Sequence, residues 1–155
     1  MKIISGGQTG ADRAALDFAI QHNIRHGGWC PRGRLAEDGS IPAHYDLNET
    51  PSRTYSERTE WNVRDSDATV VFSIAPQPVG GTALTLAIAR RLKKPCLHLA
   101  RDAAGARTPR EFAERLLSFI KEHSVGRLNI AGPRASQEPG IAAFVGEVLH
   151  AALDG

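Results

Sequence analysis

The hydrophobic residues of this chain follow two spacings that alternate along its length. Short runs in which nearly every residue is apolar are typical of buried β-strands, whereas apolar residues three or four positions apart indicate one face of a helix. The first pattern predicts strands at about residues 2–5, 24–29, 68–73, 96–100 and 127–132. The second pattern predicts helices at about residues 11–21, 55–66, 83–92, 109–120 and 138–153.

This alternation predicts an α/β protein, because parallel neighbouring strands need a long crossover connection, which is usually a helix. We therefore expect a three-layer α/β sandwich with a mainly parallel sheet, formed by one domain over residues 1–155. The helix at 83–92 is apolar on nearly all sides, so we expect it near the centre of the fold. Residues 30–50 are rich in Gly, Pro and charged residues and predict a long loop, of a kind that is usually functional or mobile.

Two helix starts carry the spacing of a capping box, in which a Thr side chain and a Glu side chain three residues later satisfy each other's backbone amides. Thr54 and Glu57 have this spacing before the second expected helix. Thr108 and Glu111 have it before the fourth, and Pro109 occupies a first-turn position that suits proline.

Composition narrows the class of protein without identifying it. The 155 residues are 41% apolar and 23% charged, which is ordinary for a soluble globular protein. Nineteen Lys and Arg against seventeen Asp and Glu give a net charge of +2, too small to indicate a nucleic-acid partner. No apolar run resembles a secretory leader or reaches the roughly 18 residues of a membrane span, so we expect a cytoplasmic protein with no membrane partner.

The ionisable residues suggest neither a catalyst nor a metal centre. The two cysteines form no CxxC pair and are expected to be reduced thiols. The six histidines are dispersed along the chain, and no Ser/His/Asp or Cys/His constellation is evident. We therefore predict no catalytic residue and no metal ligand.

Two glycine-rich turns stand where a parallel α/β sheet places its ligands, between the carboxyl end of a strand and the start of a helix. The first is SGGQTG at 5–10, and the second contains Gly80, Gly81 and Thr82. Backbone amides and the helix dipole favour an anion at such a turn, although a tight turn that requires positive φ explains either loop alone equally well. The two loops together predict a site that holds two parts of one phosphorylated ligand.

Two familiar phosphate-binding motifs do not fit these loops. A Walker P-loop needs a lysine after its last glycine, and Ala11 occupies that position. A dinucleotide fingerprint needs GxGxxG and an acidic residue at the end of the second strand, whereas this strand continues into Trp29 and Cys30. An NTPase and an ordinary NAD-binding protein are therefore disfavoured.

Further polar residues fall near the same expected edge of the sheet. Arg58, Asn62 and Asp65 share one face of the second helix, although a solvated helix surface explains that spacing as well. Asn129 lies in the last strand, and Arg134 follows its end, where a guanidinium presents a forked donor to a phosphate or another oxyanion.

Five motifs in the same order resemble one family. They are SGGQTGADRAALDFA, GGWCPRGRLAEDG, RTEWNVRDSDAT, the GGT turn and LNIAGPR. The chain, from about Ile3 to Val148, resembles the circularly permuted YpsA branch of the SLOG superfamily, whose members are described as molybdenum carrier proteins. The resemblance implies a Rossmann-like domain that binds a nucleotide or, in the carrier members, the molybdenum cofactor, a phosphorylated pterin known as molybdopterin with its metal.

The resemblance also implies which residues surround the ligand. Trp29 and Cys30 would flank the pocket, with the Cys30 thiol as a molybdenum ligand or, more simply, as packing. The implied binding residues are Gly6, Gly7, Gln8, Thr9, Gly10, Arg58, Thr59, Asn62, Gly80, Gly81, Thr82, Asn129 and Arg134.

Three functions remain open on the sequence. The first is a carrier that binds and protects the molybdenum cofactor, or a related anion such as molybdate, and delivers it to molybdenum-cofactor enzymes. The second is a hydrolase like the LOG-type phosphoribohydrolases, with an acid or base among Asp12, Glu37, Glu60 and Asp65, although VGGTALTLA lacks the glutamate of their PGGxGTxxE pattern. The third is a nucleotide-sensing domain. Relatives are often homo-oligomers, and an apolar stripe from Ile141 to Leu149 suits either self-association or the core.

Overall fold

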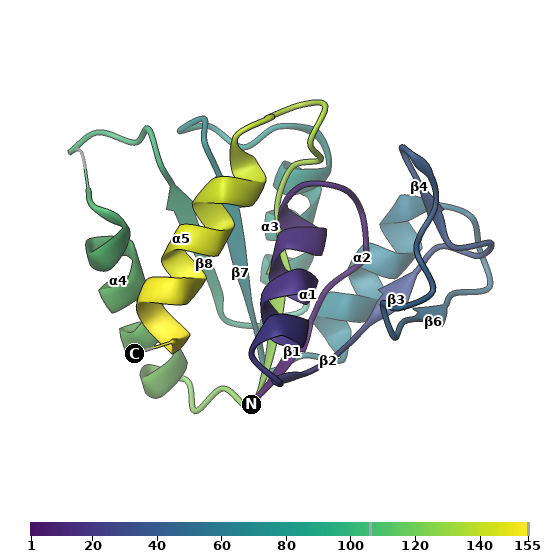
Figure 1. Cartoon of the computed structure of the whole chain (residues 1–155), viewed down its shortest axis with the longest axis horizontal. Coiled ribbons are helices and arrows are strands. Elements are labelled where there is room, and N and C mark those ends of the chain that lie inside the picture. The colour runs from purple at the N-terminus through teal and green to yellow at the C-terminus, as the bar shows by residue number, and fades with distance from the viewer. Residues whose placement is uncertain (106, 155) are drawn as a thin grey trace.

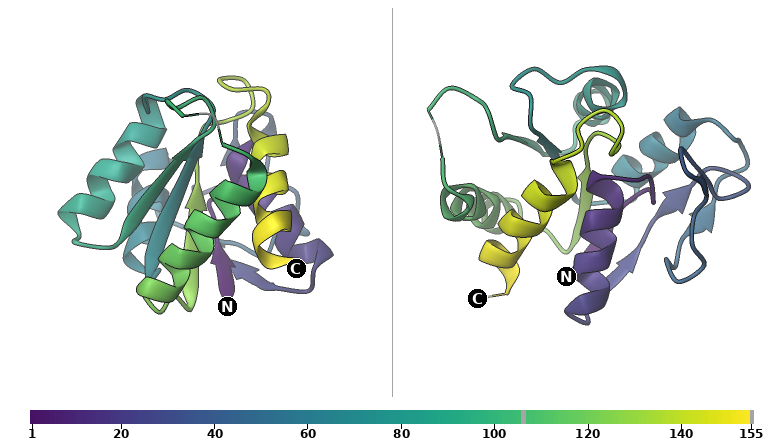
Figure 2. Two further views of the ribbon diagram at one scale, coloured as in Figure 1. Left: turned by 90° about the vertical axis from the view of Figure 1, so that its left-hand side faces the viewer. Right: turned by 45° about the horizontal axis from the view of Figure 1, so that its top comes forward.

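A parallel sheet between two helical layers forms the molecule (Figure 1). The computed structural model describes residues 1–105 and 107–154, so Ala106 and Gly155 of the predicted domain lie outside the described residues. Helices α1, α4 and α5 pack side by side on one face of the sheet, and α2 and α3 cover the other, as the two views of Figure 2 show. The helices are α1 (Ala11–Gln21), α2 (Tyr55–Arg64), α3 (Gly80–Arg91), α4 (Pro109–Glu122) and α5 (Ile141–Leu153). The predicted three-layer α/β sandwich is confirmed.

The five-stranded sheet has the order β2-β1-β9-β7-β8, and every neighbouring pair is parallel. Its strands are β1 (Lys2–Ile4), β2 (Arg25–Gly27), β7 (Ala68–Ser73), β8 (Cys96–Ala100) and β9 (Arg127–Ala131). The last strand of the chain, β9, therefore lies in the middle and pairs with β1 on one side and with β7 on the other. From this centre, the connection through α1 leads outward to β2 and the connection through α3 leads outward to β8.

The region between β2 and α2 contains more structure than the predicted loop. Gly28, with φ 135°, ends β2, so that the single strand expected at 24–29 is divided into β2 and β3 (Trp29–Cys30). Strand β3 pairs in parallel with β6 (Asn48–Glu49), and β4 (Leu35–Ala36) forms a hairpin with β5 (Gly39–Ser40). Strands of two residues carry no periodic pattern, which is why the sequence does not predict them.

Side chains tie this region to itself and to the rest of the protein. The Arg34 guanidinium donates hydrogen bonds to the carbonyl oxygens of Ile41 at 3.1 Å, Pro42 at 2.7 Å and Tyr45 at 2.9 Å. Arg13 of α1 donates two hydrogen bonds to the Asp38 carboxylate, at 2.6 and 2.8 Å. These contacts, together with a small buried cluster, hold the loop against α1. The members of the cluster are Leu16, Cys30, Ala36, Ile41, Tyr45 and Leu47.

Helix α3 differs from its prediction in its start and its position. It begins at Gly80 rather than at residue 83, so the GGT turn forms the first turn of the helix. It is also not central, because it packs on one face of the sheet beside α2 and leaves Leu84 41% exposed. Ile88 and Ala89 of α3 form a buried cluster with Val63 of α2, whereas the outer face of α3 exposes the apolar residues Leu84 and Ala87.

One of the two predicted capping boxes is present. Thr108 accepts a hydrogen bond from the Glu111 amide, and the Glu111 carboxylate accepts one from the Thr108 amide. At the start of α2, the Thr54 side chain caps nothing, since Glu57 instead accepts a hydrogen bond from the Ser52 amide at 3.0 Å. The predicted box at Thr54 is therefore wrong.

The main core lies between the sheet and the layer of α1, α4 and α5. Helix α5 begins at Ile141 rather than at residue 138, and its apolar stripe is fully committed to this core, with Phe144 3% exposed and Val145, Val148 and Leu149 fully buried. The stripe itself therefore belongs to the core and is not available for self-association. Among the described residues, no helix is long and apolar enough to cross a membrane.

Candidate functional site

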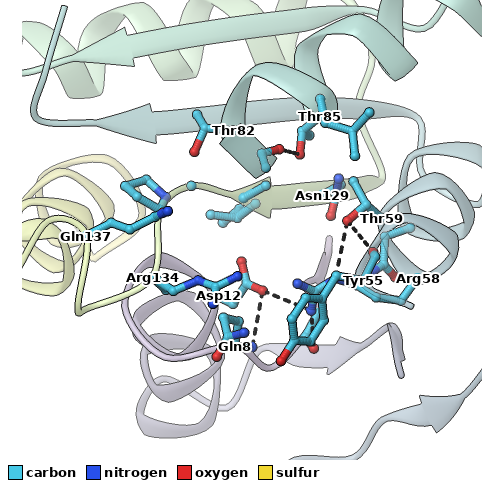
Figure 3. A pocket seen from close by; sticks show the side chains of 18 residues that line it. Gln8, Asp12, Tyr55, Arg58, Thr59, Thr82, Thr85, Asn129, Arg134 and Gln137 are labelled. Carbon is cyan, nitrogen blue, oxygen red and sulfur yellow. Dashed lines mark hydrogen bonds and ion pairs between the residues drawn. The ribbon is translucent and has the colours of Figure 1, made fainter. Parts of the chain in front are cut away.

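A pocket opens at the carboxyl end of β9, between the starts of α1 and α3 (Figure 3). The connections after β1 and β7 leave the sheet in opposite directions on either side of β9, which makes this the switch point where open α/β sheets bind their ligands. The empty space between the lining atoms is about 650 Å³, counting the open mouth. The lining residues are Gly6, Gln8, Asp12, Tyr55, Arg58, Thr59, Asn62, Gly81, Thr82, Leu84, Thr85, Asn129, Ile130, Ala131, Gly132, Pro133, Arg134 and Gln137.

Gln8 contributes an unpaired hydrogen-bond donor to this pocket. Its side-chain oxygen accepts hydrogen bonds from the backbone amides of Thr9 at 3.1 Å and Glu37 at 2.9 Å, which fixes the orientation of the amide group. Its Nε2 is buried and has no partner among the described residues, although the residue is only 4% exposed. A buried donor without a partner is costly to the fold and therefore points to an acceptor that is supplied from outside the chain.

Asp12 and Arg58 form a buried ion pair beside Gln8. The Arg58 Nη1 lies 3.6 Å from the Asp12 Oδ2 and donates a hydrogen bond to the carbonyl oxygen of Gly6 at 2.9 Å. The same Asp12 oxygen accepts a hydrogen bond from the Gln8 amide at 3.2 Å. Burial raises the pKa of the Asp12 carboxyl above its ordinary value, and Arg58 only partly opposes this effect.

Arg134 and Tyr55 also line the pocket, with Arg134 beside Asp12 and Tyr55 beside Arg58 in Figure 3. The guanidinium carbon of Arg134 lies 5.4 Å from the centre of the Tyr55 ring, and that of Arg58 lies 5.3 Å from it. Both arginines thus approach one aromatic ring, within the range of cation–π attraction. Asp12 is the one acidic residue of the lining, and Glu37, outside the lining, lies 3.9 Å from the Arg134 Nε. The lining itself therefore has two guanidinium groups against one carboxyl and favours an anion.

The two helix starts differ in how many of their amides remain available. At α1, the amide of Gln8 bonds to Asp12, that of Thr9 to the Gln8 side chain, and that of Ala11 to the Pro133 carbonyl at 3.2 Å. At α3, no side chain caps the helix, and the amides of Gly80 and Gly81 have no partner among the described residues. The positive end of α3 is therefore the better position for an anion, whereas the first loop offers mainly the Gln8 side chain.

Most of the predicted binding residues come together in this pocket. Those in its lining are Gly6, Gln8, Arg58, Thr59, Asn62, Gly81, Thr82, Asn129 and Arg134. Those outside it are Gly7, Thr9, Gly10 and Gly80.

The residues outside the lining shape the loops around the pocket. Gly7 has φ 79°, and a side chain there would meet Leu47. Gly10 has φ 82°, and an added Cβ would lie 2.6 Å from the Pro133 carbonyl oxygen, so only glycine permits this close crossing. Thr9 Oγ1 donates a hydrogen bond to the Glu37 carboxylate at 2.5 Å.

The expectation that Trp29 and Cys30 flank the pocket is wrong. Cys30 is fully buried in the small cluster against α1, and this burial raises the pKa of its thiol. Trp29 packs edge-on against Trp61, with ring centres 4.8 Å apart. Asn62 holds the backbone of Trp29 through two hydrogen bonds, at 2.7 and 2.9 Å, so this pocket residue also anchors β3.

Of the four carboxylates considered as an acid or base, Asp12 alone lines the pocket. Glu37 accepts hydrogen bonds from Thr9 and Ser136, Glu60 pairs with Arg91, and Asp65 pairs with Arg64. Each of these three carboxylates therefore has a structural role outside the pocket.

Tyr55, Thr85 and Gln137 line the pocket although the sequence did not single them out. Tyr55 lies three residues before Arg58, and Thr85 three after Thr82, so each shares a helix face with a predicted residue. That spacing is a usable signal. Gln137 belongs to an irregular segment after β9, where no periodicity exists to reveal it.

Comparisons with known proteins identify the family and support the fold. A family model described as the circularly permutated YpsA SLOG family matches residues 3–153. A crystal structure of a "putative molybdenum carrier protein" from Syntrophus aciditrophicus SB is 50% identical and superposes with a TM-score of 0.94, covering 98% of this chain and 94% of that one. No curated protein matches the chain. With a family model matched over nearly its whole length, the chain belongs to the circularly permutated YpsA family of SLOG proteins.

Proposed function

We propose that this protein binds the molybdenum cofactor, or a related oxyanion, in the pocket at the end of β9 and carries it without chemical change. The observation that carries the proposal is the buried Gln8 Nε2, a donor that lacks an acceptor within the described residues. Arg58, Arg134 and the uncapped start of α3 supply positive charge around it. The name of the structural neighbour supports molybdenum as the metal involved.

The chemistry of the pocket suits the parts of such a cargo. A phosphate group fits the free amides at the start of α3, and the aromatic ring of Tyr55 offers apolar contact area to a pterin. Gln8 would donate to an oxygen of the cargo. The space of about 650 Å³, mouth included, lies within the range of small-molecule pockets. Homo-oligomerisation, a cytoplasmic location and delivery to molybdenum-cofactor enzymes remain part of this proposal.

Thermal unfolding with a panel of ligands tests the proposal. The panel contains anaerobically prepared molybdenum cofactor, molybdate, tungstate and AMP. A ligand that binds only the folded chain at a hundred times its Kd adds about 2.7 kcal/mol, which raises the Tm of a protein of this size by about 5–10 °C. We expect the rise with the cofactor. Equal Tm values with and without the cofactor and molybdate would rule the proposal out.

Variants at two arginines locate the binding site. Arg134→Ala removes a guanidinium from the pocket and should abolish most of the ligand-induced rise in Tm. Arg110→Ala is the matched control, because the Arg110 side chain is 86% exposed and lies on α4, away from the pocket. An equal loss in both variants would show that binding is not localised in the pocket.

One observation favours hydrolysis of a nucleoside monophosphate as a second function. Asp12 is a buried pocket carboxyl whose pKa is raised, as is typical of a general acid. Incubation with AMP should then release adenine, and Asp12→Asn should not. Unchanged AMP after long incubation with the wild type would exclude this activity.

A further inference from the structure

A cluster of two histidines and one aspartate lies at the far end of α1 from the pocket. His22 is the residue that ends α1, His150 lies in the last turn of α5, and Asp154 ends α5. Since Asp12 of α1 lines the pocket and His22 lies ten residues further along the helix, the cluster is about 15 Å away along the helix axis. The two helices pack against each other, and Figure 1 shows their last turns side by side.

The spacing of the three side chains is that of metal ligands. The His22 Nδ1 lies 3.2 Å from the Asp154 Oδ1, and the His150 Nδ1 lies 2.9 Å from the Asp154 Oδ2. One ligand atom from each residue lies within 4.8 Å of the other two. Ligands held about 2.0–2.1 Å from a tetrahedral zinc ion are themselves about 3.3 Å apart. The three groups therefore need only small adjustments to share one ion.

The rest of the fold holds these groups in place. The buried ring of Phe18 lies 4.3 Å from the His22 ring and 5.4 Å from the His150 ring, centre to centre. The His22 amide bonds to the Phe18 carbonyl, and the Asp154 amide bonds to the His150 carbonyl. A site whose ligands are already ordered loses less conformational entropy when the ion binds.

The local charge also favours a cation. The carboxyl ends of two helices meet here, each with the partial negative charge of its last carbonyl groups. Two imidazoles and one carboxylate suit Zn²⁺ or Co²⁺ better than Mg²⁺ or Ca²⁺, which prefer oxygen ligands. The His150 side chain is 54% exposed and that of Asp154 46%, which leaves room for water as a fourth ligand.

We propose that His22, His150 and Asp154 bind a zinc-like divalent cation, which clips the end of α5 to the end of α1. The cluster forms only when the two helices pack, since 128 positions separate His22 from His150. That separation explains why the dispersed histidines predict no metal site. The proposal does not depend on the cargo pocket, and its test requires no cargo.

The test is a titration of metal-free protein, without a polyhistidine tag, with Zn²⁺ by calorimetry and with Co²⁺ by absorption. We expect one ion per chain, an increase in Tm with Zn²⁺, and no competition by Mg²⁺. His22→Gln and His150→Gln should each weaken binding at least tenfold. Circular dichroism without metal should show that both variants are folded.

His123→Gln is the matched control. His123 ends α4 as His22 ends α1, and its ring packs on Phe119 as that of His22 packs on Phe18, but it belongs to no such cluster among the described residues. It should bind Zn²⁺ as the wild type does. Absence of Zn²⁺ binding would overturn the proposal, as would unchanged binding in His22→Gln and His150→Gln. A thiolate signature in the Co²⁺ spectrum would also overturn it, because it would assign the metal to Cys30 or Cys96.

Discussion

The variant Asp12→Asn tests whether the pocket disfavours the ionised form of its one acidic side chain. The Asp12 carboxyl is buried, with a side chain 8% exposed. Burial outweighs the attraction of Arg58 and raises the pKa of this carboxyl above its ordinary value, which the unfolded chain keeps. Between these two pKa values, the folded state holds a proton at Asp12 that the unfolded state has released. The free energy of unfolding of the wild type should therefore fall as the pH rises through this window.

The size of this pH dependence is limited because a single proton is involved. A single group contributes at most about 1.4 kcal/mol per pH unit, which corresponds to about 3–5 °C in Tm for a chain of this length. Asn cannot ionise, so the variant lacks this pH dependence. The free energy of unfolding of Asp12→Asn should therefore rise relative to that of the wild type, by up to about 1.4 kcal/mol per pH unit. A constant offset, from the altered hydrogen bond to the Gln8 amide, does not affect the slope.

The assay is chemical denaturation of both proteins from acidic to neutral pH. Asp67→Asn serves as a control of opposite sign, because the amides of Arg127 and Gly126 lower the pKa of the Asp67 carboxyl. That variant should lose stability relative to the wild type as the pH rises out of the acid range. If the Asp12→Asn difference were flat or fell with pH, the claim that burial dominates at Asp12 would be refuted.

Substitutions at four other positions have defined outcomes. Gln8→Glu keeps an acceptor for two backbone amides but removes the Nε2 donor, so molybdate affinity measured by calorimetry should fall about 10- to 150-fold; unchanged affinity would mean that Gln8 does not face the ligand. Gly81→Asp should weaken binding of the same anion, while Gly81→Ala should not, because an added Cβ there meets nothing within 4 Å. Thr108→Ala removes the capping box of α4 and should cost about 1 kcal/mol, a Tm decrease of about 2–4 °C in a thermal melt. Phe72→Ala opens the main core and should cost about 3–5 kcal/mol in urea denaturation, and a loss below 1 kcal/mol would contradict its assigned burial.

The sequence predicts the regular elements well because their signals are local. Every strand of the central sheet and every helix was expected, since apolar runs and helical spacing depend on neighbouring residues. The sequence predicts the start of α3 three residues too late, because glycine is a poor helix former. In the structure Gly80, with φ 54°, and Gly81 belong to the first turn of this helix. The two-residue strands from β3 to β6 depend on contacts between distant residues and were missed.

The pocket was predicted in outline because a parallel sheet gathers the ends of its strands at one edge. The contacts that individual pocket residues make with the rest of the chain cannot be predicted in the same way. The position of Cys30 depends on the buried cluster that the loop after β3 forms against α1. The amides at the start of α1 are unavailable to a ligand because they bond to the Gln8 side chain and to the Pro133 carbonyl. Both are tertiary effects that residue spacing does not encode.

The central position of β9 makes it the strand that joins the two halves of the sheet. Strands β1 and β7 do not pair with each other, so β9 provides the strand pairing between two units, β2-β1 and β7-β8. The pocket lies along that seam, with walls from both halves. A bound ligand would therefore bridge the two units, and separation of the halves during unfolding would have to release it first.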